Sequence, residues 1–105
     1  MTSYRVVGVI QARMNSTRLP GKVLMKMNGV PLLVNLINRI RESKKLDQLI
    51  VATSDQPVDD AIVGICEHLG IFAFRGSENN VLSRIISAGQ RVSADAIIRL
   101  TADNP

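Results

Sequence analysis

The stretch Arg5-Val-Val-Gly-Val-Ile10 is a short, nearly continuous apolar run that is rich in valine and isoleucine. Such a run is typical of a strand buried on both faces, as in the middle of a parallel sheet. We therefore expect a central parallel strand here. Twelve mostly polar, turn-prone residues, 11–22, follow it. A loop of this length inside a small domain usually has a function.

Further along the chain, segments with helical periodicity alternate with three more β-rich runs. The expected helices cover residues 31–43, 57–69 and 80–92, and the expected strands cover 49–53, 71–74 and 96–100. This alternation predicts a parallel sheet with right-handed crossovers and helices packed on its faces. Ligands of such sheets bind at the carboxyl ends of the strands. We expect four segments to converge there: 11–22, 53–56, 75–80 and 101–104.

The composition is that of one folded domain. The chain has 105 residues, of which 46% are hydrophobic and 21% charged, so it can form a core and is too apolar to be disordered. Cys66 is the single cysteine, which excludes an internal disulfide, and it falls on the apolar face of an expected helix. The sequence has no signal-peptide pattern and no apolar stretch near membrane-spanning length, so we expect a cytoplasmic protein without a membrane partner.

Basic residues gather in the N-terminal part of the chain. Residues 1–45 hold nine basic side chains and one acidic one, a net charge of +8, whereas residues 46–105 hold four basic and eight acidic ones, a net charge of −4. The N-terminal part therefore predicts an anionic ligand, either nucleic acid or a small ligand such as a nucleoside triphosphate. The low aromatic content and the lack of a known nucleic-acid-binding motif disfavour nucleic acid.

The loop after the first strand has the side chains of a triphosphate site. It is not a Walker A loop, because Val23 stands where a serine or threonine is needed, and Gly8 is too isolated for a dinucleotide fingerprint. Arginine binds phosphate oxygens in a fork, and lysine adds a compact charge. The loop's cations and hydroxyls are Arg13, Ser16, Thr17, Arg18 and Lys22. We interpret this loop as a cradle for a triphosphate.

The string Ile10-Gln-Ala-Arg-Met-Asn-Ser-Thr-Arg-Leu-Pro-Gly-Lys-Val-Leu24 resembles the N-terminal signature of the cytidylyltransferases that activate sugars as CMP conjugates, above all the spore-coat polysaccharide branch. Acylneuraminate and 3-deoxy-manno-octulosonate cytidylyltransferases have looser versions. The resemblance continues to residue 105, through 51–55, 74–78, 80–84 and 99–105. It implies one nucleotide-binding domain over residues 1–105, with a three-layer, Rossmann-like, mostly parallel sheet of the nucleotide-diphospho-sugar transferase type and helices on both faces.

The resemblance also implies a reaction, in which a sugar hydroxyl attacks the α-phosphorus of CTP and pyrophosphate leaves, as a step in spore-coat or surface-glycan synthesis. Arg13 and Lys22 would be the catalytic groups, and Asp103 would hold Mg²⁺. The other residues implied to bind the nucleotide are Gln11, Ala12, Ser16, Arg18, Thr53, Arg75, Ser77 and Arg84. From the residues alone, Arg75 and Arg84 are equally well explained as helix-surface ion-pair partners of Glu78 or Asp95. Asp59 is expected only to favour the first turn of a helix.

Members of this family are longer, so we expect the chain to end before the part that binds the acceptor sugar. Two functions remain open. The chain is either the nucleotide-binding part of a CTP-dependent nucleotidyltransferase or a non-catalytic nucleotide-binding or assembly fragment of one. In the second case the last strand has an open edge that favours a homodimer.

Overall fold

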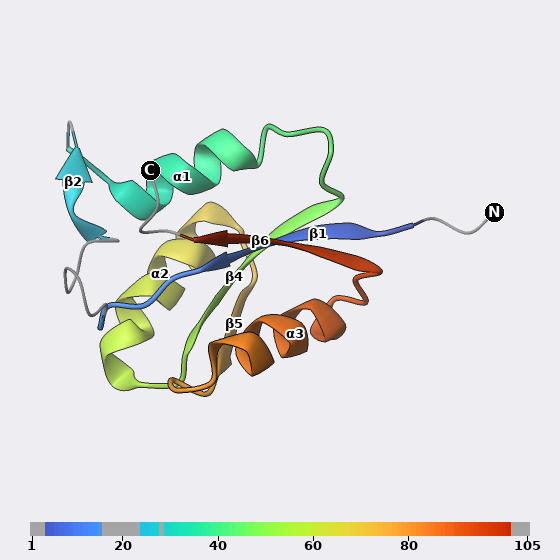
Figure 1. Cartoon of the computed structure of the whole chain (residues 1–105). Coiled ribbons are helices and arrows are strands. Elements are labelled where there is room, and N and C mark those ends of the chain that lie inside the picture. Colours follow the sequence, from blue (N-terminus) through green and yellow to red (C-terminus); the bar gives the residue numbers. More distant parts are fainter. Residues whose placement is uncertain (1–3, 16–23, 28, 102–105) are drawn as a thin grey trace.

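A computed structural model describes residues 4–15, 24–27 and 29–101 of the chain. Four strands in these residues form one parallel sheet: β1 (Val6–Gln11), β4 (Gln48–Ser54), β5 (Ala73–Gly76) and β6 (Ala96–Thr101) (Figure 1). Their order across the sheet is β5-β4-β1-β6. The first strand is therefore flanked on both sides, which confirms the prediction that it is central.

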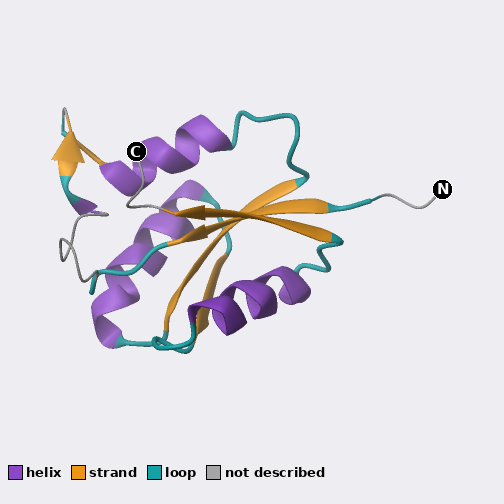
Figure 2. Cartoon of the chain, viewed as in Figure 1, coloured by secondary structure: helices purple, strands orange, loops and turns teal. Residues whose placement is uncertain are grey.

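Helices cover both faces of the sheet, as Figure 2 shows. Helices α1 (Leu32–Ile40) and α2 (Asp60–Leu69) pack on one face and α3 (Val81–Arg91) packs on the other. The predicted three-layer α/β architecture is confirmed. No described helix has the length and apolar character needed to cross a membrane.

The strand order reverses next to β1. The chain moves outward from β1 through β4 to β5 by way of α1 and α2, and then returns through α3 to β6 on the other side of β1. Open α/β sheets bind their ligands at the carboxyl end of the strands beside such a reversal. The carboxyl end of β1 is therefore the place where the fold favours a ligand.

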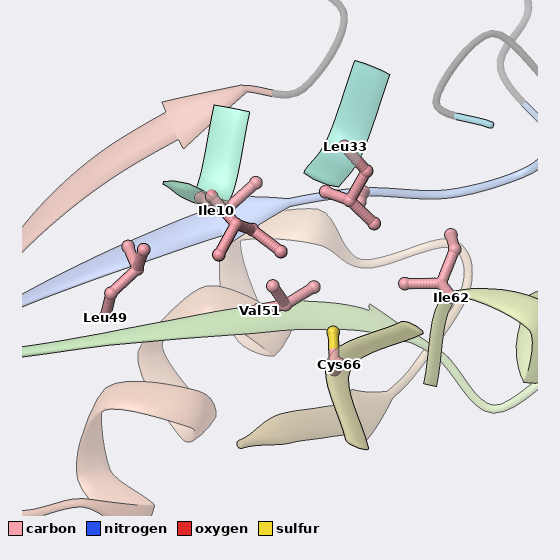
Figure 3. Close-up of a cluster of buried hydrophobic side chains, with 8 residues drawn as sticks. Ile10, Leu33, Leu49, Val51, Ile62 and Cys66 are labelled. Carbon is pink, nitrogen blue, oxygen red and sulfur yellow. The ribbon is translucent and has the colours of Figure 1, made fainter. Parts of the chain in front are cut away.

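Each face of the sheet has its own aliphatic core. On the face covered by α3, four strand residues pack against Ile85 and Ala88: Val7, Val9, Ile50 and Ala52. Figure 3 shows the cluster on the other face, whose labelled residues are Ile10, Leu33, Leu49, Val51, Ile62 and Cys66. Cys66 is thus a core residue, as predicted, and burial raises the pKa of its thiol to about 11.

Several element boundaries differ from the sequence-based expectation. β5 begins at Ala73 instead of Ile71, because Ile71 still belongs to the end of α2: its N–H donates to the carbonyl of Cys66 at 2.8 Å, and Gly70 has a left-handed φ of 72°. Helix α1 ends at Ile40, earlier than expected. Helix α2 begins at Asp60, after the short 3-10 helix η2 (Pro57–Asp59).

A small hairpin before α1 was not predicted. Strands β2 (Lys26–Met27) and β3 (Val30–Pro31) pair in antiparallel fashion. The sequence between them is Asn28-Gly29, a dipeptide typical of two-residue hairpin turns, and Gly29 has the positive φ of 81° that such turns require. The N–H of Leu32 then donates to the carbonyl of Met25 at 2.9 Å, so the hairpin leads directly into α1.

Candidate functional site

The carboxyl ends of the four strands lie at one edge of the sheet. Gln11 pairs in register with Ala52 and Thr101, and Ser54 pairs with Gly76. The segments that follow β1, β4, β5 and β6 therefore start at the same edge, as predicted. Four of the predicted site residues, Ser16, Arg18, Lys22 and Asp103, lie outside the described residues.

Three of the predicted site residues are consecutive at the end of β1: Gln11, Ala12 and Arg13. The Ala12 N–H donates to the Ala52 carbonyl at 3.1 Å, which extends the pairing one residue beyond β1. The Gln11 side chain accepts a hydrogen bond from Nη2 of Arg99 on β6 at 3.3 Å. Arg13 follows and is half-buried. The Ala12 amide is thus already used by the sheet.

Arg84 is the largest fully buried side chain among the described residues, with only 1% exposed. Its Nη1 donates to the carbonyl oxygens of Ser77 at 2.8 Å and Glu78 at 3.3 Å. Its Nε and Nη2 have no hydrogen-bond partner among the described residues. The interpretation of Arg84 as a helix-surface ion-pair partner is therefore wrong, because the guanidinium points inward from α3.

Two guanidinium groups lie near each other at this edge. Burial lowers the pKa of Arg84, the positive charge of Arg13 lowers it further, and Asp59 and Glu78 act in the opposite direction. An arginine stays protonated at neutral pH even so. The positive charges of Arg13 and Arg84 thus act on the same edge of the sheet, and Arg84 has unused donors, which favours an anionic ligand with several oxygen acceptors.

Arg75 connects β5 to the turn after β4. Its Nε donates to the Ser54 carbonyl at 3.0 Å and its Nη2 to the Gln56 carbonyl at 2.8 Å. Its Nη1 pairs with Asp60 at 2.7 Å, so the ion pair that it makes is with neither Glu78 nor Asp95. The Asp60 side chain is 69% exposed, and such a pair contributes little to stability. The role of Arg75 as a nucleotide ligand stays a prediction.

Thr53 and Ser77 complete the described part of the predicted site. Thr53 is fully buried, and its Oγ1 has no hydrogen-bond partner among the described residues. Ser77 is exposed; its hydroxyl accepts from the Asn80 N–H at 3.4 Å, and its carbonyl holds Arg84. Ser77 thus has a visible part in orienting Arg84, and direct contact of either residue with a nucleotide stays a prediction.

Asp59 was missed as a site residue. Its side chain is 1% exposed, and its Oδ1 accepts the Met14 N–H at 2.7 Å. Its Oδ2 accepts a hydrogen bond from the Ser54 hydroxyl. The sequence around Asp59 indicates only the start of a helix. It could not predict the contact with Met14, which lies 45 residues away in the chain.

The Mg²⁺ prediction depends on Asp103. Among the residues that the structure describes, no three histidine, cysteine, aspartate or glutamate side chains are grouped closely enough to hold a metal ion. Mg²⁺ at a nucleotide needs only one or two carboxylates, since phosphates and waters supply its other ligands. Asp103 follows β6 in the sequence but lies outside the described residues, so its role as a Mg²⁺ ligand stays a prediction.

The fold is an open, parallel α/β sheet, and Arg13 and Arg84 lie at its carboxyl edge. Comparison with known proteins gives the family. The family model described as cytidylyltransferase matches residues 7–105, and the chain belongs to this family.

Of three relatives of this chain, two have a named function. The chain is 48% identical over 101 residues to an uncharacterized protein of Methanocaldococcus jannaschii, and 46% identical over 104 residues to the spore coat polysaccharide biosynthesis protein SpsF of Bacillus subtilis. It is 33% identical over 107 residues to the 3-deoxy-manno-octulosonate cytidylyltransferase of Acidobacterium capsulatum. These alignments cover 95–100% of this chain and 42–43% of the relatives, so the chain spans less than half of their length.

Two solved structures have folds similar to that of this chain. A cytidylyltransferase from Leptospira borgpetersenii matches with a TM-score of 0.91 and 36% identity over 96% of this chain and 42% of that one. CMP:2-keto-3-deoxy-manno-octonic acid synthetase, solved in complex with CTP, matches with a TM-score of 0.78 and 30% identity over 96% of this chain and 41% of that one. Both likenesses confirm the predicted fold class.

Proposed function

We propose that this chain binds CTP at the carboxyl edge of its sheet, as the nucleotide-binding part of an enzyme that transfers CMP to a sugar. The observation that carries the proposal is the buried Arg84 guanidinium, whose Nε and Nη2 have no partner among the described residues and which lies near Arg13. A triphosphate supplies the acceptor oxygens that these donors lack. The CTP complex of the similar synthetase supports the choice of nucleotide.

The proposed reaction is a nucleotidyl transfer. The sugar hydroxyl oxygen forms a bond to the α-phosphorus of CTP, the bond from that phosphorus to the pyrophosphate oxygen breaks, and the hydroxyl proton passes to water. Arg13 and Lys22 stabilise the negative charge that grows on the phosphate oxygens, while Ser16 and Arg18 hold the phosphates in place. Mg²⁺ held by Asp103 supplies further charge neutralisation when it is bound.

The base would lie along Gln11 and Ala12, with Thr53, Arg75 and Ser77 closing the site. The Ala12 N–H already donates to the Ala52 carbonyl, so the Ala12 backbone can offer the base only its carbonyl oxygen, which accepts hydrogen bonds. Cytosine has an amino group at position 4, whereas the corresponding position of a uracil-type base is a carbonyl oxygen. A backbone acceptor at this point therefore favours CTP over UTP.

The phosphate cradle is tested by titration calorimetry of the chain with CTP and Mg²⁺. We expect Arg13→Ala and Lys22→Ala each to weaken CTP binding at least about tenfold, the loss of one charged hydrogen-bond donor. Lys45→Ala, which removes an exposed cation after α1, is the matched control and should bind like the wild type. Equal affinity of all four proteins would exclude the cradle.

A CTP-binding fragment without transferase activity is the alternative, with pairing of two copies through the open sheet edge as its structural role. The two functions share the nucleotide site and differ in turnover. We expect little or no pyrophosphate release when the chain alone is mixed with CTP, Mg²⁺ and acidic sugars such as 3-deoxy-manno-octulosonate, and clear release would show that the chain itself is a transferase. CTP binding without pyrophosphate release, together with a dimer in sedimentation, indicates the fragment.

A further inference from the structure

Asp59 occupies a helix-capping position without capping its helix. It is the N-cap residue of α2, yet its carboxylate accepts no hydrogen bond from that helix. The side chain is 1% exposed, and burying a carboxylate is costly unless hydrogen bonds compensate for the lost water. The bonds that compensate here come from other segments, which points to a role other than helix initiation.

The carboxylate joins three segments at the carboxyl edge of the sheet. Oδ1 accepts the N–H of Met14, which directly follows Arg13, at 2.7 Å. Oδ2 accepts from the hydroxyl of Ser54 at the end of β4, and the same hydroxyl accepts the Gln56 N–H at 3.2 Å. We propose that Asp59 is a positioning residue that fixes the start of the loop after β1, so that Arg13 is held in place to bind the phosphates of CTP.

Both carboxylate oxygens are engaged within the protein, so Asp59 differs from a metal ligand. It also differs from two other aspartates that hold the backbone near β1. Asp47 accepts the Val6 N–H at 2.7 Å and Asp95 accepts the Arg5 N–H at 2.7 Å, but both are exposed and lie at the amino end of the strand. Asp47 therefore offers a matched control, with the same kind of bond at the same distance, far from the candidate site.

The test compares CTP affinity and thermal stability for Asp59→Ala, Asp59→Asn and Asp47→Ala in the full chain. The inference rests on the proposed function, since it assumes that the wild type binds CTP. We expect Asp59→Ala to bind CTP about 10- to 100-fold more weakly, the effect of misplacing a binding group. Asp59→Asn keeps an oxygen for the Met14 N–H and should bind within about threefold of the wild type, as should Asp47→Ala.

Three outcomes would overturn the inference. The first is wild-type affinity in Asp59→Ala, and the second is an equal loss in Asp59→Asn, which would assign the effect to charge. The third is a loss that disappears when Mg²⁺ is omitted, which would make Asp59 a metal ligand.

Hydrogen exchange of the Met14 amide separates this inference from the proposed function, because it needs no nucleotide. We expect Asp59→Ala to abolish the protection of this amide, Asp59→Asn to keep it and Asp47→Ala to leave it unchanged. Unchanged protection in Asp59→Ala refutes the positioning role even if CTP binds. Lost protection in a protein that binds no CTP upholds the hydrogen bond and refutes the proposed function and the CTP-positioning role with it.

Discussion

Arg84 is buried, and its hydrogen bonds within the chain replace only part of the hydration that its guanidinium loses. One of its three nitrogens bonds to carbonyl oxygens, while Nε and Nη2 have no partner among the described residues and Arg13 adds a second positive charge nearby. Replacing an incompletely paired buried charge by an apolar side chain of similar size is often neutral or stabilising. Ligand binding therefore explains the buried Arg84 guanidinium better than a contribution to folding stability does.

Substitution of Arg84 by methionine separates these two explanations. We expect Arg84→Met to melt at a temperature at least as high as the wild type while it binds CTP about 10- to 100-fold more weakly, the loss of one or two charged hydrogen bonds. Calorimetry and a thermal melt measure the two quantities. Arg91→Met, an exposed arginine on the same helix, is the control and should change neither. Reduced stability with unchanged CTP affinity would make Arg84 a structural residue.

The buried thiol of Cys66 predicts a dependence of stability on alkaline pH. The folded protein raises its pKa from 9.0 to about 11, so between these values the unfolded chain has lost the thiol proton and the folded chain has kept it. The free energy of unfolding should therefore fall as the pH rises from about 9 to 11, by at most about 2–3 kcal/mol from this group.

Urea unfolding at several pH values checks this expectation, with Cys66→Ala as the reference for the other groups that titrate. The difference in stability between the wild type and Cys66→Ala should shrink over the same interval. A constant difference would mean that the folded thiol titrates like an exposed one.

Residue types near the site could be predicted from the sequence, but their contacts could not. The cations and hydroxyls of the loop after β1 stand out because they follow a buried strand in an otherwise tightly connected chain. Arg84 looks like any helix-surface arginine in the sequence, and only its position on the inner side of α3 reveals its burial. The bond from Met14 to Asp59 depends on the packing of α2 against the sheet and leaves no local pattern.

Helix α2 has one glycine within it and another at its C-cap, and the two differ in backbone conformation. Gly70 ends the helix with a left-handed φ of 72°, which strains any residue that has a side chain. Gly64 lies within the helix, and a Cβ placed there meets no heavy atom within 4 Å. The same substitution should therefore have opposite effects at these two positions.

We expect Gly70→Ala to lower the free energy of unfolding by about 1 kcal/mol, because alanine strains the left-handed conformation. Gly64→Ala should raise it by about 0.5–1 kcal/mol, because alanine has the better helix propensity. Chemical denaturation of both variants beside the wild type measures the changes. A stabilising Gly70→Ala would show that α2 does not end as described.

The type of each main element was predictable because buried strands and amphipathic helices have different periods. The apolar run of β4 and the helical spacing of Ile62 and Cys66 in α2 are clear examples. Boundaries were less predictable, since they depend on tertiary hydrogen bonds such as the one that keeps Ile71 at the end of α2. The β2–β3 hairpin has only two residues in each strand, too few to form a periodic pattern.

The whole molecule has two functionally different ends. At the amino end of the sheet, Asp47 and Asp95 hold β1 through exposed hydrogen bonds to the backbone. At the carboxyl end, Arg13 and Asp59 lie beside the loop after β1, and Arg84 holds the segment after β5. The aspartates at the first end anchor the start of β1, and we propose that the second end binds the nucleotide.

Titration calorimetry of the wild-type chain with CTP, UTP and ATP, each with Mg²⁺, measures whether the carboxyl edge of the sheet binds CTP and selects its base. We expect saturable binding of one CTP per chain and an affinity for UTP that is at least about tenfold lower, because uracil has a carbonyl oxygen where cytosine has the amino donor for the backbone carbonyl at the end of β1. We also expect an affinity for ATP that is at least about tenfold lower, because its purine base is larger than the pyrimidine that the proposed site holds. Binding of all three nucleotides with equal affinity would contradict the base site, and no binding of any of them would contradict a nucleotide site at this edge of the sheet.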